Sequence, residues 1–121
     1  MAETTLVEEA EAVIKDIGRW PTLHDARVLS LTTDWAQNTV TVVLDLSGAI
    51  EWPSGNTAML TLRWHDMKNI SFDSTDRACA VYGLEITRSG IWTDSNFTPA
   101  RGCISGSIRS RRVQVVTYTA G

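Results

Sequence analysis

Hydrophobic and polar residues alternate with a period of two over most of the chain after Asp25. Such alternation, rich in β-branched residues and interrupted by turn residues at strand-length intervals, is typical of strands with one buried face. It is clearest in residues 39–47 and 57–65, which each have one apolar side. The pattern predicts strands over residues 25–34, 39–47, 57–65, 69–73, 79–88, 103–110 and 112–119.

The beginning of the chain follows a helical period instead. Apolar residues between Leu6 and Ile17 fall on one helical face, and Thr5 to Glu8 fits a capping box. Gly18 is a common helix stop because it adopts a left-handed conformation easily. The sequence therefore predicts a helix over residues 6–17.

Short, turn-rich connections such as residues 36–38 and 52–56 favour antiparallel strands, because parallel strands need long crossovers. We expect an α+β fold, in which the N-terminal helix packs on a curved or sandwich-like antiparallel β-sheet of about six to seven strands. The 121 residues are expected to form one domain, residues 1–121. Residues 90–101 form the longest stretch without a predicted element.

Composition is that of an ordinary globular domain, with 43% hydrophobic and 21% charged residues. The net charge is −3, but residues 1–60 hold nine acidic and three basic side chains, whereas residues 61–121 hold five and eight. Nucleic acid is not an expected partner, because the basic residues are not concentrated over the domain. The cluster of Arg109, Arg111 and Arg112 is interpreted as a charged strand edge.

The opening residues lack the features of a secretory signal, and no apolar run approaches the length of a membrane span. We therefore expect a cytoplasmic protein that does not interact with a membrane. Cys79 and Cys103 lack the C-x-x-C spacing of redox or zinc sites and are interpreted as two separate thiols. A disulfide would require their Cα atoms to lie within about 7 Å of each other.

Both histidines of the chain are followed directly by aspartate, in His24-Asp25 and His65-Asp66. Such pairs can bind zinc and related metals or act as general bases. The first pair begins one predicted strand and the second ends another that runs in the same direction, which separates them by on the order of 20 Å. A shared metal site is therefore not expected. Both pairs are interpreted as structural corners, in which the carboxylate accepts backbone N–H groups.

Other catalytic patterns are missing from the sequence. There is no phosphate-binding glycine loop followed by a lysine, and the stretch GCISG places Ser105 one position away from nucleophile-elbow spacing. We expect no enzymatic activity and no cofactor.

Five tryptophans are many for a chain of this length. Trp64 lies on an apolar strand face and is expected in the core. Trp35, Trp52 and Trp92 flank predicted turns, where indole rings at the surface would stack on sugars or bind a protein.

Three segments resemble a family of small bacterial proteins with a His-Asp-Ala opening strand, catalogued among polymorphic-toxin immunity proteins: WPTLHDARVLSLTTDW, AMLTLRWHDMKNISF and RGCISGSIRSRRVQVV. The resemblance covers about residues 20–117 and rests on the two His-Asp positions, a YGLEI-type strand and a glycine-containing strand before a basic one. It implies an α+β protein that neutralises a toxin by binding it, without catalysis. It identifies no site residue.

The leading hypothesis is therefore a non-enzymatic interaction protein of the immunity type, whose partner is a toxin bound through the acidic half of the chain. Self-association is compatible with this role. The alternative is a small ligand-binding, carbohydrate-binding or accessory module that uses exposed tryptophans, and a metal-dependent enzyme ranks third. The candidate partner-binding residues are Glu8, Glu9, Glu11, Asp34, Trp35, Trp52 and Trp92.

Overall fold

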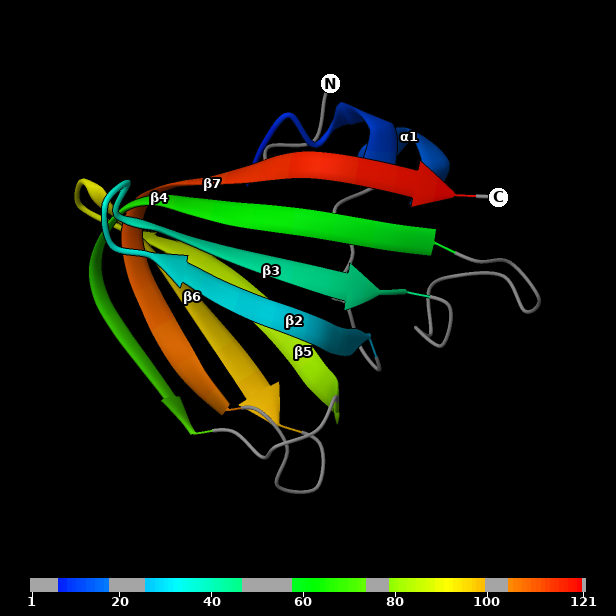
Figure 1. Cartoon of the computed structure of the whole chain (residues 1–121). Coiled ribbons are helices and arrows are strands. Elements are labelled where there is room, and N and C mark those ends of the chain that lie inside the picture. Colours follow the sequence, from blue (N-terminus) through cyan, green and yellow to red (C-terminus); the bar gives the residue numbers. More distant parts are fainter. Residues whose placement is uncertain (1–6, 18–25, 47–57, 74–78, 100–104, 121) are drawn as a thin grey trace.

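The computed structural model describes residues 7–17, 26–46, 58–73, 79–99 and 105–120. Within these ranges the chain forms one short helix and seven strands (Figure 1). The elements are β1 (Val7–Glu8), α1 (Glu11–Ile17), β2 (Arg27–Asp34), β3 (Thr39–Asp45), β4 (Ala58–Asp73), β5 (Cys79–Ser89), β6 (Trp92–Pro99) and β7 (Ser105–Ala120). No helix among the described residues has the length and apolar content needed to cross a membrane.

All seven strands belong to one sheet, in the order β1-β7-β4-β3-β2-β5-β6, and β6 also pairs with β7. The sheet therefore closes on itself. Strands β4 and β7 bend sharply at the left of Figure 1, so that each takes part in both halves of the structure. The first half consists of β1, β2, β3, the beginning of β4 and the end of β7, and the second half consists of β5, β6 and the remaining parts of β4 and β7.

The α+β prediction is wrong, because the described chain is mostly antiparallel sheet and α1 contributes only seven residues. The predicted helix over residues 6–17 begins too early: Val7 and Glu8 pair in parallel with Val113 and Gln114 of β7. Glu9 then adopts a positive φ of 57°, which separates this strand from the helix. The apparent capping box from Thr5 to Glu8 does not start a helix, because Glu8 lies in strand β1. The apolar spacing nevertheless marked residues that are buried, since Val7 and Val13 both contact the core.

Two pairs of predicted strands are in fact single bent strands. Residues 57–65 and 69–73 were predicted separately, but β4 continues through both and pairs with β7 over its whole length. The register shifts between Met67 and Asn69, and Asp66 has a φ of 54°, so the strand bends without ending. β7 likewise joins the predicted strands 103–110 and 112–119.

Strand β6 lies within the stretch for which no element was predicted. Its sequence is mostly polar, yet it pairs with both β5 and β7. Its inward positions include Thr93 and Ser95, which are buried hydroxyl residues, so the strand lacks the apolar alternation on which sequence prediction depends.

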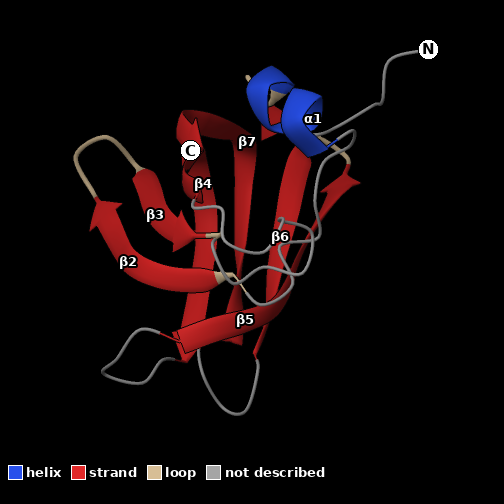
Figure 2. Cartoon of the chain, turned by 90° about the vertical axis from the view of Figure 1, so that its right-hand side faces the viewer, coloured by secondary structure: helices blue, strands red, loops and turns tan. Residues whose placement is uncertain are grey.

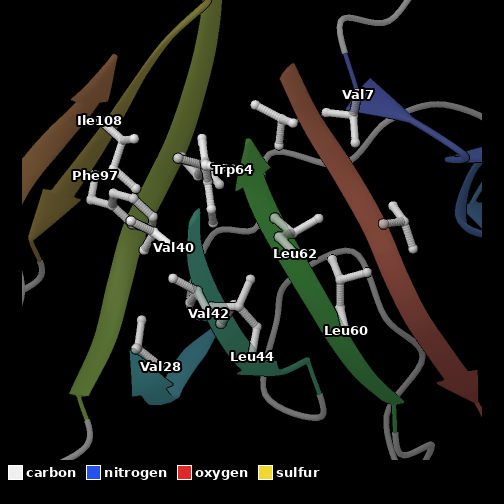
Figure 3. Close-up of a cluster of buried hydrophobic side chains, with 14 of the residues drawn as sticks. Val7, Val28, Val40, Val42, Leu44, Leu60, Leu62, Trp64, Phe97 and Ile108 are labelled. Atoms are coloured by element: carbon white, nitrogen blue, oxygen red, sulfur yellow. The ribbon is translucent and has the colours of Figure 1, made fainter. Parts of the chain in front are cut away.

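The core is built mainly from the inward faces of β3 and β4, as the alternation predicted. Leu62 and Trp64 are fully buried beside Val40 and Val42 of the neighbouring strand. Figure 3 shows Phe97 and Ile108, from the second half of the sheet, on the side of this core where Val40 and Trp64 lie. The Trp64 and Phe97 rings lie 5.8 Å apart, and the Trp64 Nε1–H donates to Ser95 Oγ at 2.8 Å. Trp64 therefore joins the two halves through both apolar contact and a buried hydrogen bond.

Candidate functional site

The face of β1, β7, β4, β3 and β2 that points away from the core carries the candidate site, and we call it the outer face. The strand residues that alternate with the buried ones make up this face, and most of them are polar. A hollow of about 520 Å³ lies on it. Its lining residues are Ser30, Thr32, Asp34, Gln37, Thr39, Thr41, Val43, Arg63 and His65.

Arg63 occupies the middle of the outer face, because it is paired with Thr41 on one side and Gln114 on the other. Its Nε–H donates to Thr41 Oγ1 at 3.1 Å, and the side chain is half-buried. Among the described residues, Nε is the one donor of this guanidinium that has a partner. The remaining N–H groups of Arg63 can therefore donate to a carboxylate or carbonyl oxygen of a bound molecule.

His65 belongs to a chain of hydrogen bonds that crosses β7. Gln114 Nε2 donates to the Glu9 carboxylate, which leaves Gln114 Oε1 as the acceptor facing His65 Nε2 at 2.7 Å. In this arrangement His65 Nε2 carries a hydrogen and donates it to Gln114 Oε1. Glu8 extends the polar face, since one of its carboxylate oxygens lies 3.3 Å from Arg112 Nε.

Asp34 shapes the turn between β2 and β3. Its Oδ1 accepts the backbone N–H groups of Ala36 at 3.0 Å and Gln37 at 3.1 Å. Asn38, with a φ of 55°, donates through Nδ2 to Met67 O at 2.9 Å and accepts Met67 N–H at 3.3 Å. These bonds fix the turn that carries Trp35, whose side chain is 71% exposed.

A second, smaller hollow of about 360 Å³ lies on the outside of the other half of the sheet. Arg109 makes two hydrogen bonds to the Asp94 carboxylate there, at 2.7 and 2.9 Å. These bonds hold the pKa of Asp94 below its ordinary value of 3.8, although partial desolvation opposes the shift, and they raise the pKa of Arg109. Because these groups satisfy each other, this hollow offers less to a ligand than the outer face does. Sequence reasoning missed it because no strand was predicted at Asp94.

The structure brings four of the sequence-predicted site residues to the outer face: Glu8, Glu9, Asp34 and His65. Glu11 is exposed in the first turn of α1. Asp66 does not stand between two strands as predicted but at the bend within β4. His24, Asp25 and Trp52 lie outside the described residues.

The tryptophans do not gather into one patch in the described part of the chain. Trp64 is buried, and half-buried Trp92 has Lys68 Nζ 5.0 Å from its ring centroid. Figure 2 shows the β2–β3 turn, which carries Trp35, and the end of β5, next to Trp92, on opposite sides of the molecule. Of these three, only Trp35 stands largely in solvent.

No group of three or more histidine, cysteine, aspartate or glutamate residues suited to a metal ion occurs in the described ranges. Among the ionisable residues that line the larger hollow, Asp34 and His65 were singled out from the sequence, whereas Arg63 was not. The sequence did indicate its orientation, because Arg63 stands between the apolar residues Leu62 and Trp64 and its side chain must therefore lie on the opposite, polar side of β4.

Comparisons with protein-family models, with curated proteins and with solved structures found no match for this chain.

Proposed function

We propose that the protein acts by binding another protein on its outer face, in the manner of an immunity protein that neutralises a toxin without catalysis. The observation that supports this most strongly is the hollow lined by Arg63 and His65 of β4 together with Asp34 of β2, on the two sides of β3. These residues offer hydrogen-bond donors and acceptors of both charge signs, as a polar protein interface requires.

The outer face is also ordered before a partner arrives. The Arg63 side chain is held by Thr41, His65 by Gln114, and Asp34 by the backbone of its own turn. Side chains that are already ordered lose less conformational entropy on binding, so each contact contributes more to affinity. The hydrogen-bonded arrangement therefore favours recognition of a folded partner.

The carboxylates around the edge of the outer face are suited to binding a basic partner. Glu8, Glu9 and Asp34 lie around the polar centre, and Arg112 neutralises Glu8 only in part because both side chains are about half exposed. Exposed carboxylates of this kind accelerate encounter with a positively charged surface. We propose that a basic toxin is oriented by these carboxylates and then held by contacts in the hollow.

The test uses the purified chain and the product of a toxin-like reading frame next to its gene, with affinity measured by titration calorimetry. Arg63→Ala should weaken binding by about tenfold or more, because it removes a charged donor from the centre of the interface. Arg88→Ala is the matched control, since Arg88 is an exposed arginine on β5, in the other half of the sheet. Equal affinities for the wild-type chain and both variants would rule out the outer face.

One observation favours the alternative of a small carbohydrate-binding module: Trp35 is 71% exposed on a turn that is held in place by hydrogen bonds. Titrating a glycan panel while following tryptophan fluorescence tests it. A saturable change that disappears in Trp35→Phe would favour this module over the protein-binding role.

A further inference from the structure

Arg63 is a half-buried cation without a carboxylate partner in the part of the chain that the structure describes. Its neighbours on the outer face are Thr41 and Gln114 across the adjacent strands, and Thr61 and His65 along its own strand. None of these side chains is acidic. A charged group that loses part of its hydration without gaining a counter-ion costs free energy. The surroundings of Arg63 are therefore suited to an anion that comes from another molecule.

The hydrogen bond to Thr41 determines which part of the Arg63 guanidinium can bind this anion. Nε donates to Thr41 Oγ1 at 3.1 Å, so the side chain leans toward β3 and the Nε donor is used. The N–H groups of the two Nη atoms remain, and they form one end of a planar fork. Two parallel N–H groups match the two oxygens of a carboxylate or one edge of a phosphate.

The opposite side of the larger hollow carries a negative charge. Asp34 of β2 is separated from Arg63 of β4 by strand β3, which places their Cα atoms roughly 10 to 12 Å apart. Asp34 Oδ1 accepts both N–H groups of its turn, whereas Oδ2 has no partner among the described residues. Oδ2 can therefore accept a hydrogen bond from a cationic nitrogen. The same charge repels a phosphate dianion and leaves a carboxylate as the better ligand for Arg63.

Hydroxyl groups line the hollow between these two charges. They belong to Thr32, Thr39 and Thr41. A hydroxyl can both donate and accept, so the three threonines can bind either polar group of a peptide bond. The hollow thus offers a cation on one side, a carboxylate on the other, and neutral hydrogen-bonding groups in the middle.

We propose that the larger hollow binds a zwitterionic segment of the partner, with a carboxylate on Arg63 and a cationic nitrogen on Asp34. This inference rests on the proposed function of the outer face and names the chemistry of its central contact. The basic surface of the partner must present one carboxylate here, because Arg63 would otherwise be enclosed by positive charge. The carboxylate and a basic group about 10 Å from it together fix the orientation of the partner.

Triglycine is the probe for this site, because three extended residues hold an ammonium and a carboxylate group about 10 Å apart. It is titrated into the isotope-labelled full chain at constant ionic strength, and binding is followed by NMR. The Arg63 Nε–H and the amide groups of the Asp34 turn should shift along one saturable curve. Triglycinamide, which lacks the carboxylate, and N-acetyltriglycine, which lacks the ammonium group, should each bind about threefold more weakly or worse.

Two variants assign each charge of the probe to its residue. Arg63→Gln should bind triglycine and triglycinamide equally, because the residue that recognises the carboxylate is gone. Asp34→Asn should bind triglycine and N-acetyltriglycine equally, while its remaining oxygen still accepts the turn N–H groups. Arg88→Gln is the matched control, since Arg88 is an exposed arginine on β5, and it should bind all three probes like the wild type.

The absence of saturable shifts with triglycine, or equal binding of all three probes by the wild type, would overturn the proposal. Probe selectivity that persists in Arg63→Gln and Asp34→Asn would place the site elsewhere and overturn it as well. If triglycine failed to bind while Arg63→Ala still weakened binding of the toxin-like protein, the outer-face function would stand without this site. If triglycine bound as expected while Arg63→Ala left that affinity unchanged, the hollow would still be a zwitterion site and the proposed function would fail.

Discussion

Ser95→Ala should destabilise the protein far more than the loss of one oxygen atom suggests. Ser95 and Trp64 are both fully buried, and the Trp64 Nε1–H donates to Ser95 Oγ at 2.8 Å. Alanine leaves this N–H without its acceptor in a fully buried site. A buried unsatisfied donor costs about 1–3 kcal/mol, and the cavity left by one hydroxyl is small. We therefore expect the free energy of unfolding to fall by about 1–3 kcal/mol.

Urea denaturation followed by circular dichroism measures this change, because Trp64 fluorescence would itself respond to the substitution. The midpoint should fall with the slope m unchanged, since the surface exposed on unfolding stays the same. Ser30→Ala is the control: Ser30 is exposed on the outer face, so its loss should stay within about 0.5 kcal/mol. If Ser95→Ala were as stable as Ser30→Ala, the bond would not join the two halves of the sheet as inferred.

Three other variants have expected outcomes. Leu62→Ala should lower the free energy of unfolding by about 2–5 kcal/mol in urea titrations, because Leu62 is fully buried; a loss below about 1 kcal/mol would contradict its central position. The pKa of Asp94 is lowered on folding, so its stabilising effect is present above pH 3.8 and is lost as the pH falls below that value. Asp94→Asn should therefore reduce the loss of unfolding free energy that the wild type shows as the pH is lowered through this range. If the variant lost as much stability in acid as the wild type, the ion pair with Arg109 would not contribute to stability. Changing the exposed carboxylates of the N-terminal segment to lysine should lower the association rate constant with a basic partner and weaken the salt dependence of that rate, with a smaller effect on the dissociation rate. Stopped-flow association rates equal to those of the wild type would mean that the binding face lies elsewhere. The substituted residues are Glu8, Glu9 and Glu11.

The sequence was most informative where one face of a strand is purely apolar. β3 and the beginning of β4 were predicted with the correct buried faces, because valine, leucine and tryptophan occupy nearly all of the inward positions there. β6 could not be found in this way, because two of its inward positions are Thr93 and Ser95. Ser95 is tolerated inside only because Trp64, distant in sequence, provides a donor for it.

Bends and helix boundaries depend on contacts between distant residues. Nothing in the local sequence shows that β4 continues through Asp66, because the partner that keeps it in the sheet is β7. Val7 is suited to a helix or a strand, and the presence of Val113 beside it decides for the strand. For the candidate site, Asp34 and His65 were noticed as unusual residues, but their proximity to Arg63 follows from strand register, which the sequence alone did not specify.

The position of β7 in the sheet has a consequence for how the protein is made. β7 pairs with β1, β4 and β6, yet a ribosome synthesises it after all three of these strands. Until residues 105–120 leave the exit tunnel, β3 is the only described strand that β4 can pair with, and β5 is the only one for β6. The nascent chain can form the local β2–β3–β4 and β5–β6 hairpins, but it cannot close the sheet. During this interval the open edges of β4 and β6 are available to other chains, so protection by chaperones would matter most until β7 has emerged.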